Sequence, residues 1–306
     1  MTQTVARTNK STIVRLFSAP WPVRATFGAL EWVAPAIGAR WAAKIWLTLP
    51  RPKPGRAAQR PPGGASFVIR VNDLPSRARS SNVAGTDVIG EVWGDGPSVY
   101  LVHGWAGNRG QFHEFVAPLV ARGFRVVAFD MPSHGDSAPG PSGRRSSTFA
   151  EFTETLQQVV ARYGRPHAIV AHSAGAIATA GALCDGLPAD RVVLIAPMAS
   201  GTSHVRDFAT VLGFGNRTLA RMVGRIERRV GAPMSHFDVP ELARAVAMPP
   251  ALVIHDREDR SSPVTDGAAV AAAWRGARLK VTSGLGHNRI LRSPEVVADA
   301  VDFIAA

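Results

Sequence analysis

From residue 65 onward, short and almost continuous apolar runs alternate with longer stretches of helical character. Such runs suit strands that are buried on both faces of a parallel sheet, and the alternation indicates βαβ units with helices on both faces. Two further runs, at 67–71 and 87–93, alternate in polarity and predict an antiparallel strand pair at the N-terminal side. The predicted sheet strands are 98–103, 125–130, 168–172, 192–196, 251–255 and 279–282, and the predicted helices are 111–122, 146–163, 174–185, 266–275 and 294–304.

The pentapeptide Ala-His-Ser-Ala-Gly at 171–175 directly follows one of these apolar runs. Ser173 therefore stands where a strand ends and a helix begins, and its small neighbours allow a tight turn. Such a turn lifts one hydroxyl clear of the sheet, which is the geometry of a nucleophile elbow. Taken alone, a serine in this setting is more often a helix N-cap or a packing residue.

Loops at the carboxyl ends of three other predicted strands carry residues that could assist this serine. Open α/β sheets bind ligands at that edge, so these loops are expected to meet there. They are 103–105 (His-Gly-Trp), 257–259 (Arg-Glu-Asp) and 284–287 (Gly-Leu-Gly-His). The chain order Ser173, Asp259, His287 is that of α/β-hydrolase triads and differs from the chymotrypsin and subtilisin orders.

Five segments together give the sequence a resemblance to bacterial α/β-hydrolase-fold serine hydrolases. They cover roughly residues 85–305 and occur in the order and spacing of that family. The resemblance implies an α/β-hydrolase fold, with a mostly parallel twisted sheet and helices on both faces. The segments are LVHGWAG (101–107), FDMPSHGDS (129–137), AHSAGA (171–176), LVIHDREDRSSP (252–263) and GLGHNRIL (284–291).

The predicted catalytic roles follow from what acyl transfer needs. Ser173 is a weak nucleophile as a neutral alcohol, so we expect His287 to remove its proton and later return it to the leaving group. Asp259 would orient the imidazole and stabilise the imidazolium. For the oxyanion, the N–H of Ala174 is free at the start of a helix, and the family resemblance adds the N–H of Trp105.

Neighbouring residues leave some alternatives open. His103, Gly104 and His172 are expected beside the site, with the two histidines as structural hydrogen-bonding residues. Asp256 stands where the family commonly has a glycine, and it is either a supporting residue or the actual acid. Ala171 replaces the usual first glycine of G-x-S-x-G and is small enough for the turn.

Residues 1–60 are predicted as a basic, tryptophan-rich helical segment apart from a hydrolase domain at 61–306. Apolar residues step by three or four from Val23 to Ile45, Pro35 should kink or split this helix, and the Pro-rich run at 51–55 predicts a linker. Two interpretations stay open. The segment is a membrane-surface helix, or it is a helical pair packed on the core domain.

Residues 198–248 form an interval longer than one crossover helix requires, and we expect a lid over the site there. Its apolar residues either shape a site for an apolar acyl or alcohol group or pack the lid onto the core. They are Phe208, Leu212, Phe214, Leu219, Met222, Met234 and Phe237.

The charge distribution and the absence of certain motifs limit which partners and cofactors are predicted. The net charge of +12 is concentrated in the first 65 residues, which hold ten Lys or Arg and one acid, so no groove-sized basic face and no nucleic-acid partner are predicted for the domain. Without HExxH, paired CxxC, phosphate-loop or nicotinamide motifs, neither a metal nor a cofactor is predicted. One cysteine and no evident secretory signal predict a cytoplasmic location, with membrane association through 1–60 as the open alternative.

The leading functional prediction is hydrolysis of an ester or thioester through an acyl-enzyme. The same triad also serves amidases, C–C bond hydrolases and acyltransferases, and the fold does not choose among them. A serine at 173 argues against dehalogenases and epoxide hydrolases, which use an aspartate nucleophile. Outside catalysis, the alternative is a binding protein that acts at a membrane surface through residues 1–60.

Overall fold

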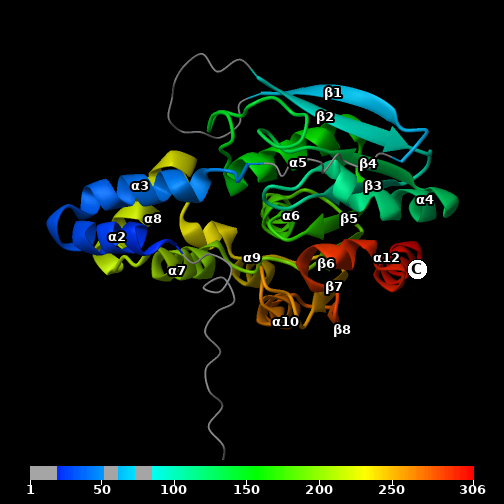
Figure 1. Cartoon of the computed structure of the whole chain (residues 1–306). Helices are drawn as coiled ribbons and strands as arrows, with labels where there is room; N and C mark the ends of the chain where they lie inside the picture. The colour runs from blue at the N-terminus through cyan, green and yellow to red at the C-terminus, as the bar shows by residue number, and fades with distance from the viewer. Residues whose placement is uncertain (1–18, 52–60, 73–84) are drawn as a thin grey trace, which may run out of the picture.

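The computed structural model describes residues 19–51, 61–72 and 85–306. Its strands are β1 (Ala65–Val71), β2 (Thr86–Trp93), β3 (Ser98–Val102), β4 (Arg125–Phe129), β5 (Pro166–His172), β6 (Arg191–Ile195), β7 (Ala251–Asp256) and β8 (Ala277–Thr282). They form one eight-stranded sheet in the order β1-β2-β4-β3-β5-β6-β7-β8 (Figure 1). β2 pairs antiparallel with β1 and β4, and the pairings from β4 to β8 are parallel. The predicted fold class and the antiparallel strand pair are therefore confirmed.

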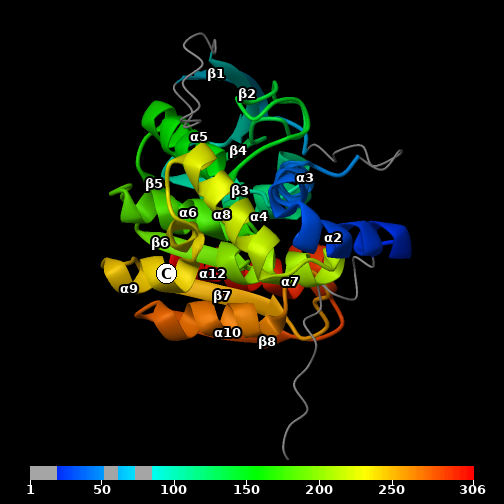
Figure 2. The ribbon, with the colours of Figure 1, turned by 90° about the vertical axis from the view of Figure 1, so that its left-hand side faces the viewer.

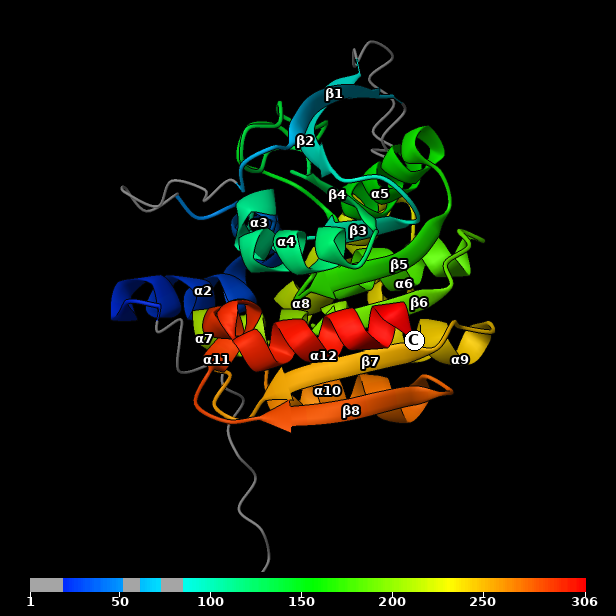
Figure 3. The same ribbon diagram turned by 90° about the vertical axis from the view of Figure 1, so that its right-hand side faces the viewer.

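Strand β3 shows why the predicted runs are apolar almost throughout. Val99 and Leu101 belong to the core beneath α4 (His113–Ala121) and α12 (Pro294–Ala305), which Figure 3 shows in front of the sheet. Tyr100 and Val102 belong to the opposite core, beneath α5 (Phe149–Tyr163) and α6 (Gly175–Cys184). Alternate residues thus bury opposite faces, as a sheet covered on both sides requires. α10 (Val264–Ala273) completes the predicted helices, with small shifts at the ends.

The N-terminal helical stretch is two helices, α2 (Trp21–Val33) and α3 (Pro35–Leu47). They are divided at Ala34, so Pro35 splits the helix, as predicted. The residues from Val23 to Ile45 that were predicted to form one apolar stripe do not share one environment, since Phe27 is buried whereas Ile45 is exposed. The break at Ala34 changes the helical phase between the two parts. The linker predicted at 51–55 lies, apart from its first residue, outside the described residues.

Helices α2 and α3 pack on the insertion at 198–248, which contains α7 (Gly201–Leu212), α8 (Asn216–Val230), the 3-10 turn η2 (Met234–Phe237) and α9 (Val239–Ala245). Figure 2 shows α2, α3, α7 and α8 together on one side of the molecule. In Figure 3 the arrowheads of β7 and β8 point toward the side on which α2 and α7 lie. Helices α2 and α3 are therefore a packed helical pair whose main contact is the insertion.

Two charged side chains of α2 hold the turn between α7 and α8. The carboxylate of Glu31, which is 8% exposed, accepts hydrogen bonds from the N–H groups of Arg217 (2.9 Å) and Thr218 (3.0 Å) in the first turn of α8. The guanidinium of Arg24 donates to carbonyls in the last turn of α7, including that of Val211 at 2.6 Å. Helix N-termini favour anions and C-termini favour cations, so α2 satisfies both helix ends.

Aromatic contacts complete the junction between the N-terminal helices and the insertion. The rings of Phe27 and Phe214 lie 5.4 Å apart between centroids, and those of Trp46 and Phe208 lie 5.2 Å apart in an edge contact. Such pairs add stability beyond the area that they bury. Within the described ranges, no helix has the length and apolar character needed to cross a bilayer.

Candidate active site

Ser173 occupies a left-handed backbone conformation, with φ +53°, between β5 and α6. A non-glycine residue in this region costs on the order of 1–3 kcal/mol and is held there by its surroundings. Its N–H donates to the Ile195 carbonyl at 3.1 Å, and its carbonyl accepts from the Met198 N–H at 3.1 Å. Gly175 lets α6 begin this close to β3, because a Cβ there would lie 2.5 Å from the Val102 carbonyl oxygen. The structure therefore places Ser173 in a tight strand-to-helix turn.

His287 lies between Ser173 and Asp259 and is within hydrogen-bond distance of both. Its Nε2 is 3.0 Å from the Ser173 Oγ, and its Nδ1 is 2.7 Å from the Asp259 Oδ2. A carboxylate accepts only, so the imidazole proton resides on Nδ1 and the Nε2 lone pair faces the serine hydroxyl. The structure thus brings together the three side chains that the sequence predicted as a triad.

Asp256, the alternative acid, supports the loop that carries His287. Its carboxylate accepts hydrogen bonds from the N–H groups of Leu285 (3.0 Å) and Gly286 (2.9 Å) and from the Thr282 hydroxyl (2.8 Å). These bonds fix the start of the short helix α11 (Gly286–Arg289). Of the two aspartates, Asp259 is the one that meets the imidazole.

Asp259 has a second histidine neighbour that the sequence analysis missed. The His255 Nε2 lies 3.0 Å from the Ser262 carbonyl oxygen and 3.4 Å from the Asp259 Oδ2. Because a carbonyl accepts only, this Nε2 carries the ring proton and points it toward both oxygens. Burial alone raises the pKa of Asp259, but the hydrogen bonds from His255 and His287, and the positive charge that His287 carries when it is protonated, outweigh burial and hold that pKa well below its usual range. The available signal was that His255 precedes Asp259 by four residues at the end of β7.

The loop after β3 passes directly beside Ser173. A Cβ on Gly104 would lie 2.8 Å from the Ser173 Cβ, so only glycine allows this approach. Trp105 follows Gly104 in the chain, and Ala174 follows Ser173. Neither backbone N–H donates a hydrogen bond to another group in the described part of the chain. Two N–H donors, on the residues that follow Gly104 and Ser173, are therefore available to a ligand.

His103 and His172 hold the loops around the serine. The His103 Nε2 accepts from the Met131 N–H at 2.9 Å, so its Nδ1–H donates to the Gly104 carbonyl at 2.8 Å. The His172 Nε2–H donates to the His287 carbonyl at 2.9 Å. Burial lowers the pKa of His103 to about 4, and burial together with the neighbouring His287 lowers that of His172 to about 3. Both imidazoles are therefore neutral at pH 7 and serve as fixed hydrogen-bonding groups.

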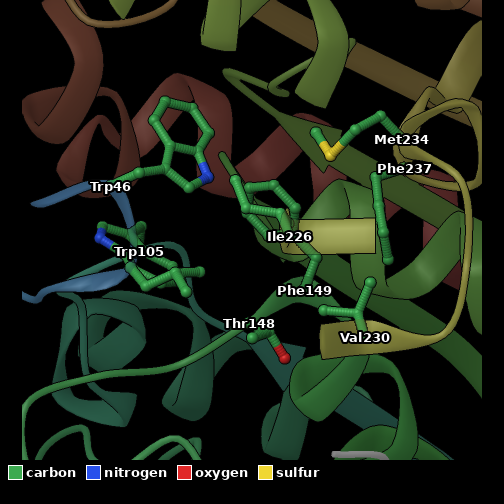
Figure 4. Close-up of a pocket in the computed structure, with 9 residues that line it drawn as sticks. Trp46, Trp105, Thr148, Phe149, Ile226, Val230, Met234 and Phe237 are labelled. Atoms are coloured by element: carbon green, nitrogen blue, oxygen red, sulfur yellow. The ribbon is translucent and has the colours of Figure 1, made fainter. Parts of the chain in front are cut away.

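A small apolar cavity lies beside Trp105, between the N-terminal helices, α5 and the insertion (Figure 4). Its walls are Trp46, Leu47, Trp105, Thr148, Phe149, Ile226, Val230, Met234 and Phe237. Its volume is about 20 Å³, which suits about one water molecule. Met234 and Phe237 are two of the seven apolar insertion residues singled out in the sequence. Trp46, from α3, was not predicted to reach this place.

The polar groups gathered here are a hydroxyl, an imidazole, a carboxylate and two backbone N–H donors. Across the described ranges, no three His, Cys, Asp or Glu side chains are grouped so that they could hold a metal ion. The side chains of Ser173, His287 and Asp259 instead form a linear chain of hydrogen bonds. This arrangement can activate the hydroxyl as a nucleophile.

Comparison with known proteins agrees with this architecture. A family model described as "Alpha/beta hydrolase family" matches residues 99–300, about two thirds of the chain. The chain belongs to the alpha/beta hydrolase family. The matched range includes every loop that carries Trp105, Ser173, Asp259 and His287, and it confirms the resemblance predicted from the sequence.

Individual relatives of this alpha/beta hydrolase are distant in sequence. A non-heme haloperoxidase of Rhodococcus erythropolis is 26% identical over 270 residues, covering 72% of this chain and 96% of that protein. The solved esterase RhEst1 from Rhodococcus sp. ECU1013 has a TM-score of 0.56 at 18% identity, over 79% of this chain and 98% of that one. A thioesterase domain from the curacin biosynthetic pathway has a TM-score of 0.55 at 14% identity, over 79% and 99%. These structural likenesses show the fold, and family membership identifies the chain as a hydrolase in general terms.

Proposed function

We propose that this alpha/beta hydrolase is a serine hydrolase that cleaves carboxylic esters or thioesters through an acyl-enzyme at Ser173. The observation that carries the proposal is the pair of hydrogen bonds made by His287, 3.0 Å to the Ser173 Oγ and 2.7 Å to the Asp259 Oδ2. A nucleophile, a base and an orienting acid within hydrogen-bond reach form the arrangement that activates a serine. The strained turn at Ser173 supports the same role.

Acylation begins when the Ser173 Oγ attacks the carbonyl carbon of the substrate. As the O–C bond forms, the hydroxyl proton passes to the His287 Nε2, and the carbonyl electrons move onto oxygen. Asp259 stabilises the imidazolium through its bond to Nδ1. The intermediate then expels the alcohol or thiol, which takes the proton from Nε2. Water repeats the sequence on the acyl-enzyme and restores the serine.

The oxyanion needs donors that are in place before the reaction begins. In the proposal, the N–H groups of Trp105 and Ala174 donate to it, and removal of one such donor typically costs about 3–4 kcal/mol of transition-state stabilisation. The close approach of Gly104 to Ser173 supports this assignment, because it sets one donor loop directly against the other. Esters and thioesters are the proposed substrates because alcohols and thiols leave more readily than amines.

The apolar cavity beside Trp105 supports an apolar acyl or alcohol group. Pockets that hold small-molecule ligands are commonly about 300–1,000 Å³, far larger than the cavity here. An acyl chain therefore requires outward movement of the walls that Ile226, Val230, Met234 and Phe237 contribute. In the proposal, the insertion acts as a lid over the site.

The test is covalent labelling of the full chain by a fluorophosphonate probe, with Ser173→Ala as the decisive variant. We expect labelling of the wild type, none of Ser173→Ala, and unchanged labelling of Ser203→Ala, a serine of the insertion. No labelling of folded wild type, or equal labelling of Ser173→Ala, would overturn the proposal.

A series of p-nitrophenyl esters and acyl thioesters of increasing chain length then measures acyl preference. Preferred turnover of an amide, or acyl transfer to an added alcohol in place of water, would assign another reaction of the same triad.

A further inference from the structure

Helices α2 and α3 carry a concentration of exposed apolar side chains. Of the nine large apolar side chains that are exposed in the described part of the chain, six lie on these two helices. Their exposed fractions run from 37% for Ile45 to 80% for Val33. The six, here called the apolar face, are Trp21, Trp32, Val33, Ile37, Trp41 and Ile45. Single exposed apolar residues are ordinary, but a cluster with three tryptophans marks an interaction surface.

Packing within the protein does not account for the apolar face. The buried residues of α3 are mainly small, namely Gly38, Ala39, Ala42 and Ala43, together with Leu47. Small residues let α3 approach α8 closely, and a Cβ on Gly38 would lie 3.3 Å from the Thr218 side chain. The large residues Ile37, Trp41 and Ile45 recur every four positions and are exposed. Trp41 also stacks on Phe27, with 5.4 Å between the ring centroids, and leaves 45% of its surface exposed. A helix that served only to pack on the insertion would bury its large apolar residues and expose the small ones.

A line of arginines lies next to the apolar face. Arg217, Arg221, Arg225 and Arg228 recur every three or four positions along α8, and all four are exposed. The Arg217 guanidinium lies over the Trp32 ring, 5.8 Å from its centroid, so the two features touch. We call these four residues the basic stripe.

No exposed acid balances the basic stripe on these helices. In the described α2, α3 and α8 the only acidic residues are Glu31 and Glu227. Glu31 is buried against the start of α8, and Glu227 accepts a hydrogen bond from the Met234 N–H at 3.0 Å. α3 adds the exposed cations Arg40 and Lys44. The surface is therefore apolar and cationic at once.

We propose that the apolar face and the basic stripe together bind the surface of an anionic lipid bilayer. Exposed tryptophans beside Lys and Arg suit the interface, where the rings enter the headgroup boundary and the cations meet anionic headgroups. A second copy of the chain is a poorer partner, because a two-fold contact would set one basic stripe against the other. The bilayer supplies both the apolar layer and the negative charge that this surface matches.

Docking by this surface would bring the cavity close to the bilayer. Trp46, one residue after Ile45 on α3, lines the cavity beside Trp105. The same helix therefore connects the docking surface with the wall of the cavity. The docking proposal does not depend on the chemistry at Ser173, so the two can fail separately.

The experiment is co-sedimentation of the full chain with phosphatidylcholine vesicles, with and without phosphatidylglycerol. We expect binding that requires phosphatidylglycerol. Replacing the three residues Trp21, Trp32 and Ile37 by serine should weaken binding at least about tenfold, because their apolar surface no longer enters the interface. The pair Arg221→Gln and Arg225→Gln should weaken it about 25-fold, since each cation near an anionic bilayer contributes about a factor of five.

Matched control variants distinguish binding through this surface from non-specific binding to vesicles. Val68→Ser removes an apolar residue of β1 that is 65% exposed, and Arg275→Gln removes an exposed cation that follows α10. Both should bind as the wild type does, and circular dichroism melting should show every variant folded. Sedimentation velocity gives the oligomeric state of wild type and triple variant.

Three results would overturn the proposal. The first is no binding of the wild type to phosphatidylglycerol vesicles. The second is equal binding by wild type and the triple serine variant. The third is a wild-type dimer that the triple variant converts to monomer, which would assign the apolar face to a second copy of the chain.

Discussion

Two regions of the molecule treat charge in opposite ways. At the carboxyl ends of β5 and β7, His172, Asp256 and Asp259 are buried, and the Asp259 carboxylate is surrounded by donors. In the unit made by α2, α3, α7 and α8, the exposed charge is mainly of one sign, and the buried Glu31 serves a helix end. Buried pairing favours a fixed geometry for chemistry, whereas exposed charge of one sign favours attraction to a surface. Substitutions in one region should therefore leave the property of the other intact.

The largest expected effect is the loss of turnover in Asp259→Asn. An asparagine that turns its NH2 group toward Nδ1 favours the other tautomer, and it has no negative charge to stabilise the imidazolium, so kcat on an activated ester should fall about 10⁴-fold. Asp256→Asn should lower kcat far less, because Asp256 contacts the loop before His287 and not its ring. Vesicle binding should be unchanged in both. The assignment of the acid fails if Asp256→Asn abolishes turnover while Asp259→Asn does not.

The two regions also differ in how much of them the sequence could reveal. Each group of the site follows its own apolar strand run, and parallel strands bring those ends to one edge, so Ser173, Asp259 and His287 could be placed together from local patterns. The role of His255 could not be predicted from the sequence, because it depends on a hydrogen bond to the Ser262 carbonyl that forms only in the folded loop.

The helical unit depends on contacts between distant segments. Glu31 accepts hydrogen bonds from the N–H groups of Arg217 and Thr218, which lie 186 and 187 residues further along the chain. No local sequence pattern predicts a partner at that separation. The apolar period that continues past Pro35 predicted one apolar stripe along both helices. The break at Ala34 and the close packing of small residues on α8 turned the large residues of α3 outward. The fold was therefore predictable at the sheet and much less so in these helices.

A second large effect is acid destabilisation by buried histidines around the site. Burial lowers the pKa of His103 to about 4 and, with neighbouring imidazole charge, lowers those of His134 and His172 to about 3. Below about pH 6.5 the unfolded chain protonates these histidines while the folded chain does not, so the free energy of unfolding falls as the pH is lowered. From about pH 6.5 to about pH 5.5 the loss is about 1 kcal/mol for each histidine.

Urea unfolding at several pH values measures the total, and NMR titration of each imidazole isolates the histidines. The isolation matters because burial raises the pKa values of Glu151 and Asp130, which act in the opposite sense. The arginines of the basic stripe do not titrate in this range, so vesicle binding should stay constant where stability falls. Imidazole pKa values near 6.5 for His103 and His172 would contradict the prediction.

Glu31→Gln should weaken the helical unit without touching the chemistry. The amide offers one acceptor where the carboxylate offers two to the N–H groups of Arg217 and Thr218, and it removes the negative charge at the start of α8. The free energy of unfolding should fall by about 2 kcal/mol. Glu241→Gln is the matched control, an exposed acid in the first turn of α9, with an expected change of a few tenths of a kcal/mol. Equal changes in the two variants would remove the special role of Glu31, and fluorophosphonate labelling should persist in both.

The smallest expected effect concerns the contribution of His255 to the orientation of Asp259. His255→Leu removes the N–H that faces Asp259 and the Ser262 carbonyl, so the carboxylate keeps fewer donors and orients His287 less well. We expect kcat to fall about tenfold, the value of one hydrogen bond to a charged group, with KM unchanged. His255→Gln retains an N–H donor and should recover most of the loss. An equal fall in both variants would make His255 a packing residue, whereas recovery by glutamine would show that the donor itself positions Asp259.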